Sequence, residues 1–140
     1  MLLSKLKVSI VIPVKNAGLL LQQVIDSVLN QSVPWEYDVL VIDSGSTDGT
    51  VDYIKSLEHV RLHQIKPEDF SHGKTRNLGV SLTSGEFVVM MTHDALPASD
   101  KWLFELVSAV EQSDCIAGSF GRHLAYGHHG PLITRDLTMH

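Results

Sequence analysis

Two short stretches decide the fold: residues 7–12, Lys-Val-Ser-Ile-Val-Ile, and residues 37–42, Tyr-Asp-Val-Leu-Val-Ile. Both are rich in β-branched residues and almost continuously apolar, which is typical of strands buried on both faces of a parallel sheet. Between them, residues 20–29 carry leucine, valine and isoleucine at helical spacing. The sequence therefore begins with a predicted strand, helix and second strand.

The alternation of strands and helices continues along the chain. Further strands are predicted near an edge of the sheet at residues 60–65, in its centre at 87–91, and at 115–120. Helices are predicted over 50–57, 71–82 (with Ser71 as the cap) and 101–112. This order predicts an α/β fold, with a mostly parallel sheet flanked by helices.

Length, charge and cysteine content restrict the class of protein. The 140 residues include 11 Lys and Arg against 16 Asp and Glu, a net charge of −5. This length predicts a single domain over residues 1–140, and the acidic balance argues against nucleic-acid binding. No apolar run approaches the roughly 20 residues that cross a bilayer, so a cytoplasmic protein without a membrane segment is expected. The lone Cys115 is predicted to be a buried, inert thiol in the 115–120 strand.

Polar residues follow three predicted strands, at the positions where α/β sheets bind ligands. Residues 13–16 (PVKN), 43–50 (DSGSTDGT) and 92–97 (THDALP) hold these positions. Asp43 and Asp94 are expected to meet at one edge, where two carboxylates need a cation or hydrogen-bond donors beside them. Such an edge suits a ribose or base and a divalent ion that holds a diphosphate, with Lys74 and Arg76 available for phosphate charge.

Simpler interpretations of these residues exist. An Asp after a strand often only forms a turn or caps the next helix. The Ser44–Gly49 segment lacks the Gly-x-x-x-x-Gly-Lys pattern of a phosphate-binding loop. The His128-His129 pair, which a zinc hydrolase could use, lacks spaced cysteines or an evident third ligand.

Taken together, the strand ends resemble family 2 glycosyltransferases of GT-A fold. The resemblance rests on four blocks in the family's order: residues 8–16 (VSIVIPVKN), 39–50 (VLVIDSGSTDGT), 74–79 (KTRNLG) and 84–89 (SGEFVV). Three further segments are similar to the rhamnosyltransferase branch in particular: 70–77 (FSHGKTRN), 94–97 (DALP) and 121–124 (GRHL).

The resemblance implies inverting transfer of a sugar from a UDP- or dTDP-linked donor to a hydroxyl of a saccharide or lipid-linked acceptor. Rhamnosyl transfer in cell-surface polysaccharide synthesis is the implied process, and a lipid-linked acceptor would bring the protein to the membrane surface. The family pattern assigns nucleotide binding to Pro13, Val14, Lys15, Asp43 and Arg76.

The chain departs from the family at the Asp-x-Asp loop. Thr92 stands at the first acidic position, and Ala95 follows where a second consecutive Asp is common. Asp94 remains to bind Mg²⁺ or Mn²⁺, which takes further ligands from water and substrate phosphates. His93 is a conceivable second ligand and is also assigned to nucleotide binding.

No residue matches the family's catalytic base, which is a carboxylate further along the chain. Asp136 is of the right type but stands in no matching motif, and residues 121–140 are expected to begin the acceptor-side region of an incomplete fold. The alternative is a non-catalytic nucleotide-sugar-binding fragment. A signalling module with Asp43 as phosphoacceptor is disfavoured because Pro13–Asn16 stands where paired acids would be needed.

Overall fold

The computed structural model describes residues 5–124, which divide into two compact units, one ending at Leu103 and the other beginning at Phe104. The elements in chain order are β1 (Val8–Val14), α1 (Gly18–Leu29), β2 (Tyr37–Asp43), α2 (Thr50–Lys55), β3 (Val60–Gln64), the 3₁₀ turn η1 (Pro67–Asp69), α3 (His72–Ser81), β4 (Phe87–Met90) and α4 (Trp102–Val110). The single domain expected over residues 1–140 stays a prediction. Among residues 5–124, no helix has the length and hydrophobicity needed to span a bilayer.

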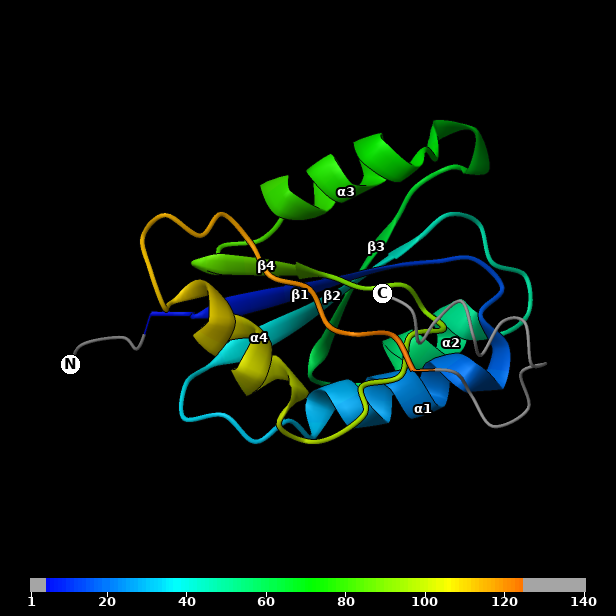
Figure 1. Ribbon diagram of the computed structural model, residues 1–140. Helices are drawn as coiled ribbons and strands as arrows, with labels where there is room; N and C mark the ends of the chain where they lie inside the picture. The colour runs from blue at the N-terminus through cyan, green and yellow to red at the C-terminus, as the bar shows by residue number, and fades with distance from the viewer. Residues whose placement is uncertain (1–4, 125–140) are drawn as a thin grey trace. The chain divides into compact units, whose positions relative to one another are not determined.

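The four strands form one parallel sheet in the order β3-β2-β1-β4 (Figure 1). β1 pairs with β2 from Val8↔Tyr37 to Val14↔Asp43, so the two strands end level with each other. The crossovers run through helices, as the alternating pattern predicts. The β1 and β2 residues are almost all buried, which confirms the two decisive stretches as inner strands.

β1 includes Pro13 and ends at Val14, two residues past the end of the predicted strand at residue 12. Val11 accepts a hydrogen bond from the Met91 amide, so its backbone groups point towards β4. Pro13 lies two residues further on and points the same way, beyond the last β4 register pair at Val11↔Met90. Because no ladder hydrogen bond is required of it there, the missing N–H does not interrupt the sheet.

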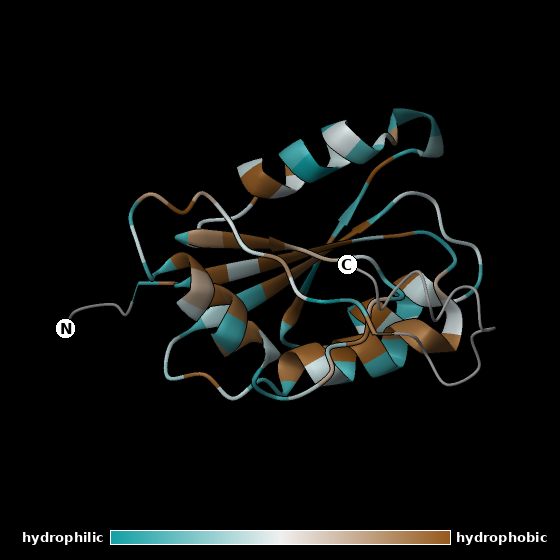
Figure 2. Ribbon diagram, in the orientation of Figure 1, coloured by the Kyte–Doolittle hydropathy of each residue, from teal (hydrophilic) through white to brown (hydrophobic). Residues whose placement is uncertain are grey.

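Helices cover both faces of the sheet, with α1 and α2 on one side and α3 on the other (Figure 1). α1 buries the stripe Leu21, Val24, Ile25 and Val28, as its spacing predicts. On the other side, Val11, Leu40 and Ile42 form an apolar cluster with partly buried residues that include Leu82 and Met90. Figure 2 shows the contrast between the hydrophobic inner strands and the largely hydrophilic α3.

Three sequence-based expectations were wrong. β4 lies at an edge of the described sheet rather than its centre, and its four residues are only half-buried. An apolar run signals burial, but strand order depends on the crossovers. Residues 116–120 form no strand, since a short apolar run needs a hydrogen-bonded neighbour that local pattern cannot supply. Cys115 is therefore exposed rather than buried.

Candidate functional site

A cavity of about 310 Å³ opens at the carboxyl ends of the strands, in the unit that ends at Leu103. Its volume is at the lower end of the range for small-molecule sites. The residues that line it are Pro13, Val14, Lys15, Ser44, Pro67, Phe70, His72, Arg76, Met91, Thr92, His93 and Asp94. The structure thus brings together every residue assigned to the nucleotide or the metal except Asp43.

Asp43 is not among the residues that line the cavity, and it is only 1% exposed. Its Oδ2 accepts hydrogen bonds from the Gly45 amide at 3.0 Å and the Ser46 amide at 3.2 Å, and its Oδ1 accepts from Ser46 at 3.3 Å. The carboxylate therefore shapes the loop after β2, which is the simpler role that Asp often has at a strand end. Direct contact between Asp43 and a nucleotide stays a prediction.

The connection after β3 supplies lining residues that the sequence analysis missed. Pro67, Phe70 and His72 come from η1 and the start of α3. The Phe70 and His72 rings meet edge-on, with centroids 5.2 Å apart. Pro67, two residues after the third predicted strand, was the available signal, because the carboxyl end of that strand belongs to the same edge of the sheet as the others.

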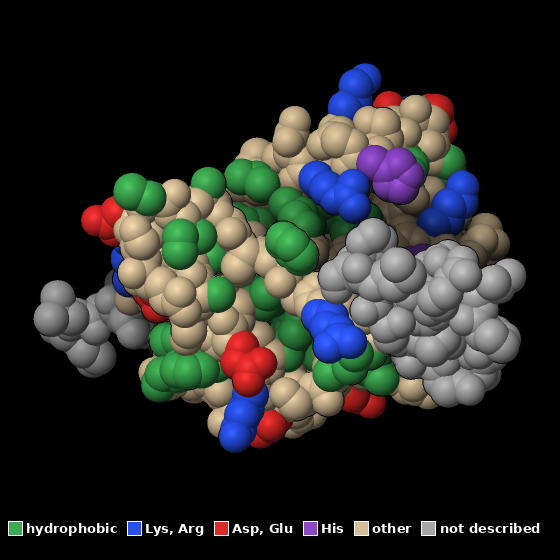
Figure 3. Space-filling model, viewed as in Figure 1, with side chains coloured by type: hydrophobic (Ala, Val, Ile, Leu, Met, Phe, Trp, Pro, Cys, Tyr) green, Lys and Arg blue, Asp and Glu red, His purple; other side chains and the backbone are tan. Residues whose placement is uncertain are grey.

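The first turn of α3 carries positive charge to the cavity. Ser71 caps this helix as predicted, and its Oγ accepts a hydrogen bond from the Lys74 amide at 3.2 Å. Arg76 reaches back one turn, where its Nη1 contacts the His72 carbonyl oxygen at 3.5 Å. Figure 3 shows basic and histidine side chains at and just below α3. Lys15, directly after the end of β1, lines the same cavity as Arg76. These two cations, together with the N-terminus of α3, can bind an anion such as phosphate.

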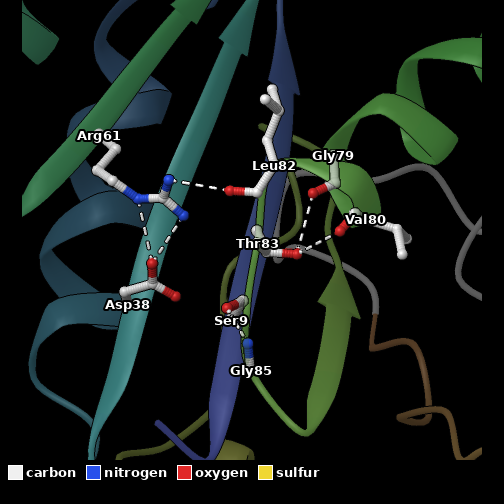
Figure 4. A network of polar contacts seen from close by, with 8 residues as sticks. All are labelled: Ser9, Asp38, Arg61, Gly79, Val80, Leu82, Thr83 and Gly85. Atoms are coloured by element: carbon white, nitrogen blue, oxygen red, sulfur yellow. Dashed lines mark hydrogen bonds and ion pairs between the residues drawn. The ribbon is translucent and has the colours of Figure 1, made fainter.

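A polar network fixes the other end of α3 (Figure 4). Arg61 donates from Nε and Nη2 to Asp38 Oδ2, at 3.1 and 2.8 Å, and from Nη1 to the Leu82 carbonyl at 3.0 Å. The Gly85 amide donates to the buried Ser9 Oγ at 3.1 Å. These contacts connect the carboxyl end of α3 and the segment before β4 to residues of three strands, β1, β2 and β3. They therefore fix the end of α3 that lies away from the cavity.

The loops after β1 and β2 also meet at the helix starts. The carboxylate of Asp48 accepts from the Gly18 amide at 3.1 Å, at the beginning of α1, and from the Thr50 amide at 3.1 Å, at the beginning of α2. The Thr50 hydroxyl, which donates to Asp48 at 2.6 Å, is the largest cause that lowers the pKa of this carboxyl. Asp48 thus serves two helices with one side chain.

Few of the described side chains at the cavity could bind a metal ion, and the candidates from the sequence are Asp94 and His93. Asp94 is exposed in a turn that the Ala95 amide closes onto the Thr92 carbonyl at 3.3 Å, and His93 beside it is half-buried. Within residues 5–124, no three His, Cys, Asp or Glu side chains are grouped to hold a metal. A divalent ion here would take most of its ligands from water and phosphate, as Mg²⁺ commonly does. Asp136 and the His128-His129 pair lie outside the described residues, as does most of the predicted acceptor-side region 121–140.

Comparison with known proteins agrees with this geometry. Residues 9–136 match the family described as glycosyl transferase family 2. The chain is 34% identical over 128 residues to the O-antigen chain rhamnosyltransferase RfbN of Salmonella typhimurium, which covers 91% of this chain. It spans only 40% of the length of RfbN.

Two solved structures share the fold. Staphylococcus aureus TarS 1–349 superposes with a TM-score of 0.67 at 24% identity, over 76% of this chain and 32% of the 1–349 chain. The mannosyltransferase PcManGT of Pyrobaculum calidifontis, solved with GDP-Man and Mn²⁺, gives 0.63 at 26% identity, over 74% of this chain and 32% of its own. The cavity at the strand ends, the parallel sheet and the match over most of the sequence lead to one conclusion: this chain belongs to glycosyl transferase family 2 and has the GT-A architecture in its described sheet.

Proposed function

We propose that the chain is the donor-binding part of an inverting glycosyltransferase that takes a UDP- or dTDP-linked sugar. The observation that carries the proposal is the cavity at the strand ends, which is lined by the cations Lys15 and Arg76 together with apolar residues that include Pro67 and Phe70. Similarity to RfbN supports rhamnosyl transfer to a saccharide or lipid-linked acceptor in cell-surface polysaccharide synthesis. A lipid-linked acceptor would place a cytoplasmic enzyme at the membrane surface.

The two kinds of lining residue match the two halves of a nucleoside diphosphate. Pro13, Pro67, Phe70 and Met91 offer apolar surface for a base and ribose. The Ser44 hydroxyl donates to the Val14 carbonyl at 3.3 Å, so its oxygen offers the nucleotide an acceptor. The ammonium of Lys15 and the guanidinium of Arg76 offer charge-assisted hydrogen bonds to the diphosphate. The cavity lining therefore includes groups suited to the base and groups suited to the phosphates.

We place the divalent ion at Asp94. Because the cavity offers one carboxylate, the ion would be shared between Asp94, water and the donor's own phosphates. It would add positive charge beside the leaving diphosphate when bound. The Mn²⁺ bound with GDP-Man in PcManGT supports the presence of a divalent ion in this proposal.

In the proposed reaction an acceptor hydroxyl oxygen attacks the anomeric carbon of the sugar. The bond from this carbon to the phosphate oxygen breaks, and the nucleoside diphosphate leaves with the bonding electron pair. Lys15 and Arg76 stabilise the negative charge that develops on the departing phosphate. The acceptor proton passes to a base, and loss of such a base typically costs about 10²–10⁴-fold in rate.

Titration calorimetry with UDP and dTDP, each with and without Mn²⁺, tests donor binding. Arg76→Ala should weaken the affinity by about ten- to a hundredfold, since a hydrogen bond to a charged group contributes about 1.5–3 kcal/mol. Lys55→Ala is the matched control, because Lys55 is an exposed cation on α2 outside the cavity. No heat with either nucleotide, or an equal loss in both variants, would refute the proposal.

A second candidate, a nucleotide-sugar-binding module without turnover, has one observation in its favour. Within residues 5–124, Asp94 is the only carboxylate that lines the cavity, and it is already assigned to the metal. Incubation with a dTDP-sugar and a saccharide acceptor separates the two functions. Release of dTDP above an enzyme-free blank supports a transferase, whereas binding without release supports the module.

A further inference from the structure

Asn16 stands directly after the cavity residue Lys15, in an uncommon backbone conformation. Its φ is +49°, in the left-handed region that asparagine tolerates better than most residues but still enters at a cost. The chain reverses direction here, between the end of β1 at Val14 and the start of α1 at Gly18. Such a conformation persists only where the surroundings hold it, and it marks a candidate functional position.

Two reciprocal hydrogen bonds hold Asn16 against the loop after β2. The Asn16 amide donates to Ser46 Oγ at 2.8 Å, and the Thr47 amide donates to Asn16 Oδ1 at 2.7 Å. We call Asn16, Ser46 and Thr47 the loop bridge. Because both bonds span 30 or more residues of sequence, the bridge joins the loop after β1 to the loop after β2, beside the bonds of the Ala17 amide to Thr50 and of the Gly18 amide to Asp48.

The loop bridge continues to the buried carboxylate of Asp43. The Ser46 amide donates to Asp43, while the Ser46 hydroxyl accepts from Asn16. A continuous chain of hydrogen bonds therefore runs from Asp43, which does not line the cavity, to the residue that follows Lys15, which does. This chain gives Asp43 a route by which it affects the cavity without touching its contents.

We propose that Asn16 is a positioning residue for the donor: the loop bridge fixes the backbone of residues 13–16 so that Lys15 meets the diphosphate. The inference rests on the proposed function. The strand ends at Val14 and Ser44 are already level, because the Ser44 amide donates to the Val14 carbonyl at 3.1 Å. The bridge extends this alignment past the sheet, where no ladder hydrogen bonds reach and a lysine would otherwise sample many positions.

The test measures UDP and dTDP affinity by calorimetry for four variants and a control. Asn16→Ala removes the acceptor and disfavours the left-handed backbone, and we expect about tenfold weaker binding. Asn16→Asp keeps an acceptor oxygen and should restore affinity to within about threefold in high salt, which screens its added charge. Asn30→Ala is the control, since Asn30 is an exposed asparagine at the far end of α1 whose Nδ2 donates to the Asp26 carbonyl.

Ser46→Ala and the double variant Asn16→Ala/Ser46→Ala show whether the two residues act as one unit. Asn16→Ala removes the acceptor of the Thr47 amide but keeps the backbone amide that donates to Ser46 Oγ, and Ser46→Ala removes that second acceptor. If the two bonds act as one unit, the double variant should lose less affinity than the sum of the two single losses. Hydrogen exchange on the same proteins should show faster exchange of the Asn16 and Thr47 amides, with little change in the inner strands. This readout shows that the variants remain folded.

The outcomes separate the two proposals. If the wild type binds neither nucleotide, the proposed function fails, and this inference fails with it. If the wild type binds and Asn16→Ala binds within twofold of it, or loses no more than Asn30→Ala, the donor site stands and the positioning role of Asn16 is wrong. Additive losses in the double variant would also overturn the bridge.

Discussion

Asp43 and Thr75 are both buried near the cavity, but they differ in whether their polar atoms have partners. The Asp43 carboxylate accepts from two backbone amides, which offset the cost of removing a charge from water. The Thr75 side chain is on the sheet-facing side of α3 and is 2% exposed, yet its Oγ1 has no hydrogen-bond partner among the described residues. A buried hydroxyl without a partner is a net cost to the folded state.

Thr75→Val should therefore leave the free energy of unfolding unchanged or raise it by up to about 1 kcal/mol, because a methyl group replaces an unsatisfied hydroxyl of similar shape. Thr83→Val is the contrasting variant. The Thr83 hydroxyl donates to the Gly79 and Val80 carbonyls at 3.0 Å, so its loss should cost about 0.5–1.5 kcal/mol. Urea denaturation compares the two, and a loss above about 2 kcal/mol in Thr75→Val would mean that this hydroxyl has a partner in solution.

α3 is the element whose placement decides the cavity, and it packs on the sheet with few apolar side chains. Its buried residues are only Thr75 and Gly79. Gly79 lets the helix approach closely: a Cβ there would lie 2.5 Å from Val11 Cγ1 and 3.4 Å from Ile42 Cδ1. The first two turns of the helix contribute His72 and Arg76 to the cavity lining.

Gly79→Ala should destabilise the protein by about 1–3 kcal/mol, because overpacking against Val11 exceeds the helical preference of alanine. Gly73→Ala is a matched control on the same helix, where a Cβ would meet nothing within 4 Å. Gly73→Ala should raise the free energy of unfolding by up to about 1 kcal/mol. Thermal denaturation measures both, and nucleotide affinity should fall only in Gly79→Ala as α3 moves outward. Equal gains in the two variants would contradict the close packing of α3.

Local pattern predicted the elements well where periodicity and caps act within one segment. The β-branched runs at 7–12 and 37–42 and the Ser71 cap are of this kind. Local pattern gave the wrong result for the position of β4 and for a strand at 115–120. Both depend on which strands, distant in sequence, pair with each other. At the site, the sequence analysis expected ligand-binding residues to gather at the carboxyl ends of the parallel strands, and Lys15, Arg76 and Asp94 do line one cavity there. It could not predict that Asp43 is buried outside the cavity lining, because the orientation of this carboxylate depends on the Gly45 and Ser46 amides that bind it.

At the scale of the whole sheet, the strands differ in how many partners they have. β1 is paired on both sides, with β2 and β4, and β2 is paired with β1 and β3. Among the described residues, β3 and β4 have one partner each. β1 ends at Val14 and β2 at Asp43. The cavity residues Pro13–Lys15 and Ser44 lie at or directly after these ends, so they extend from the strands that are paired on both sides.

Hydrogen exchange should follow this order, because the amides with the highest opening free energy belong to strands that are paired and buried on both sides. We expect the amides of β1 and β2 to exchange at least about tenfold more slowly than those of β3, whose residues Arg61 and Gln64 are exposed. β4 should also exchange faster than β1, since its residues are half-buried. Mass spectrometry of exchanged peptides measures these rates in the wild type. Protection of β4 equal to that of β1 would contradict its edge position and would indicate a further strand paired along its outer side.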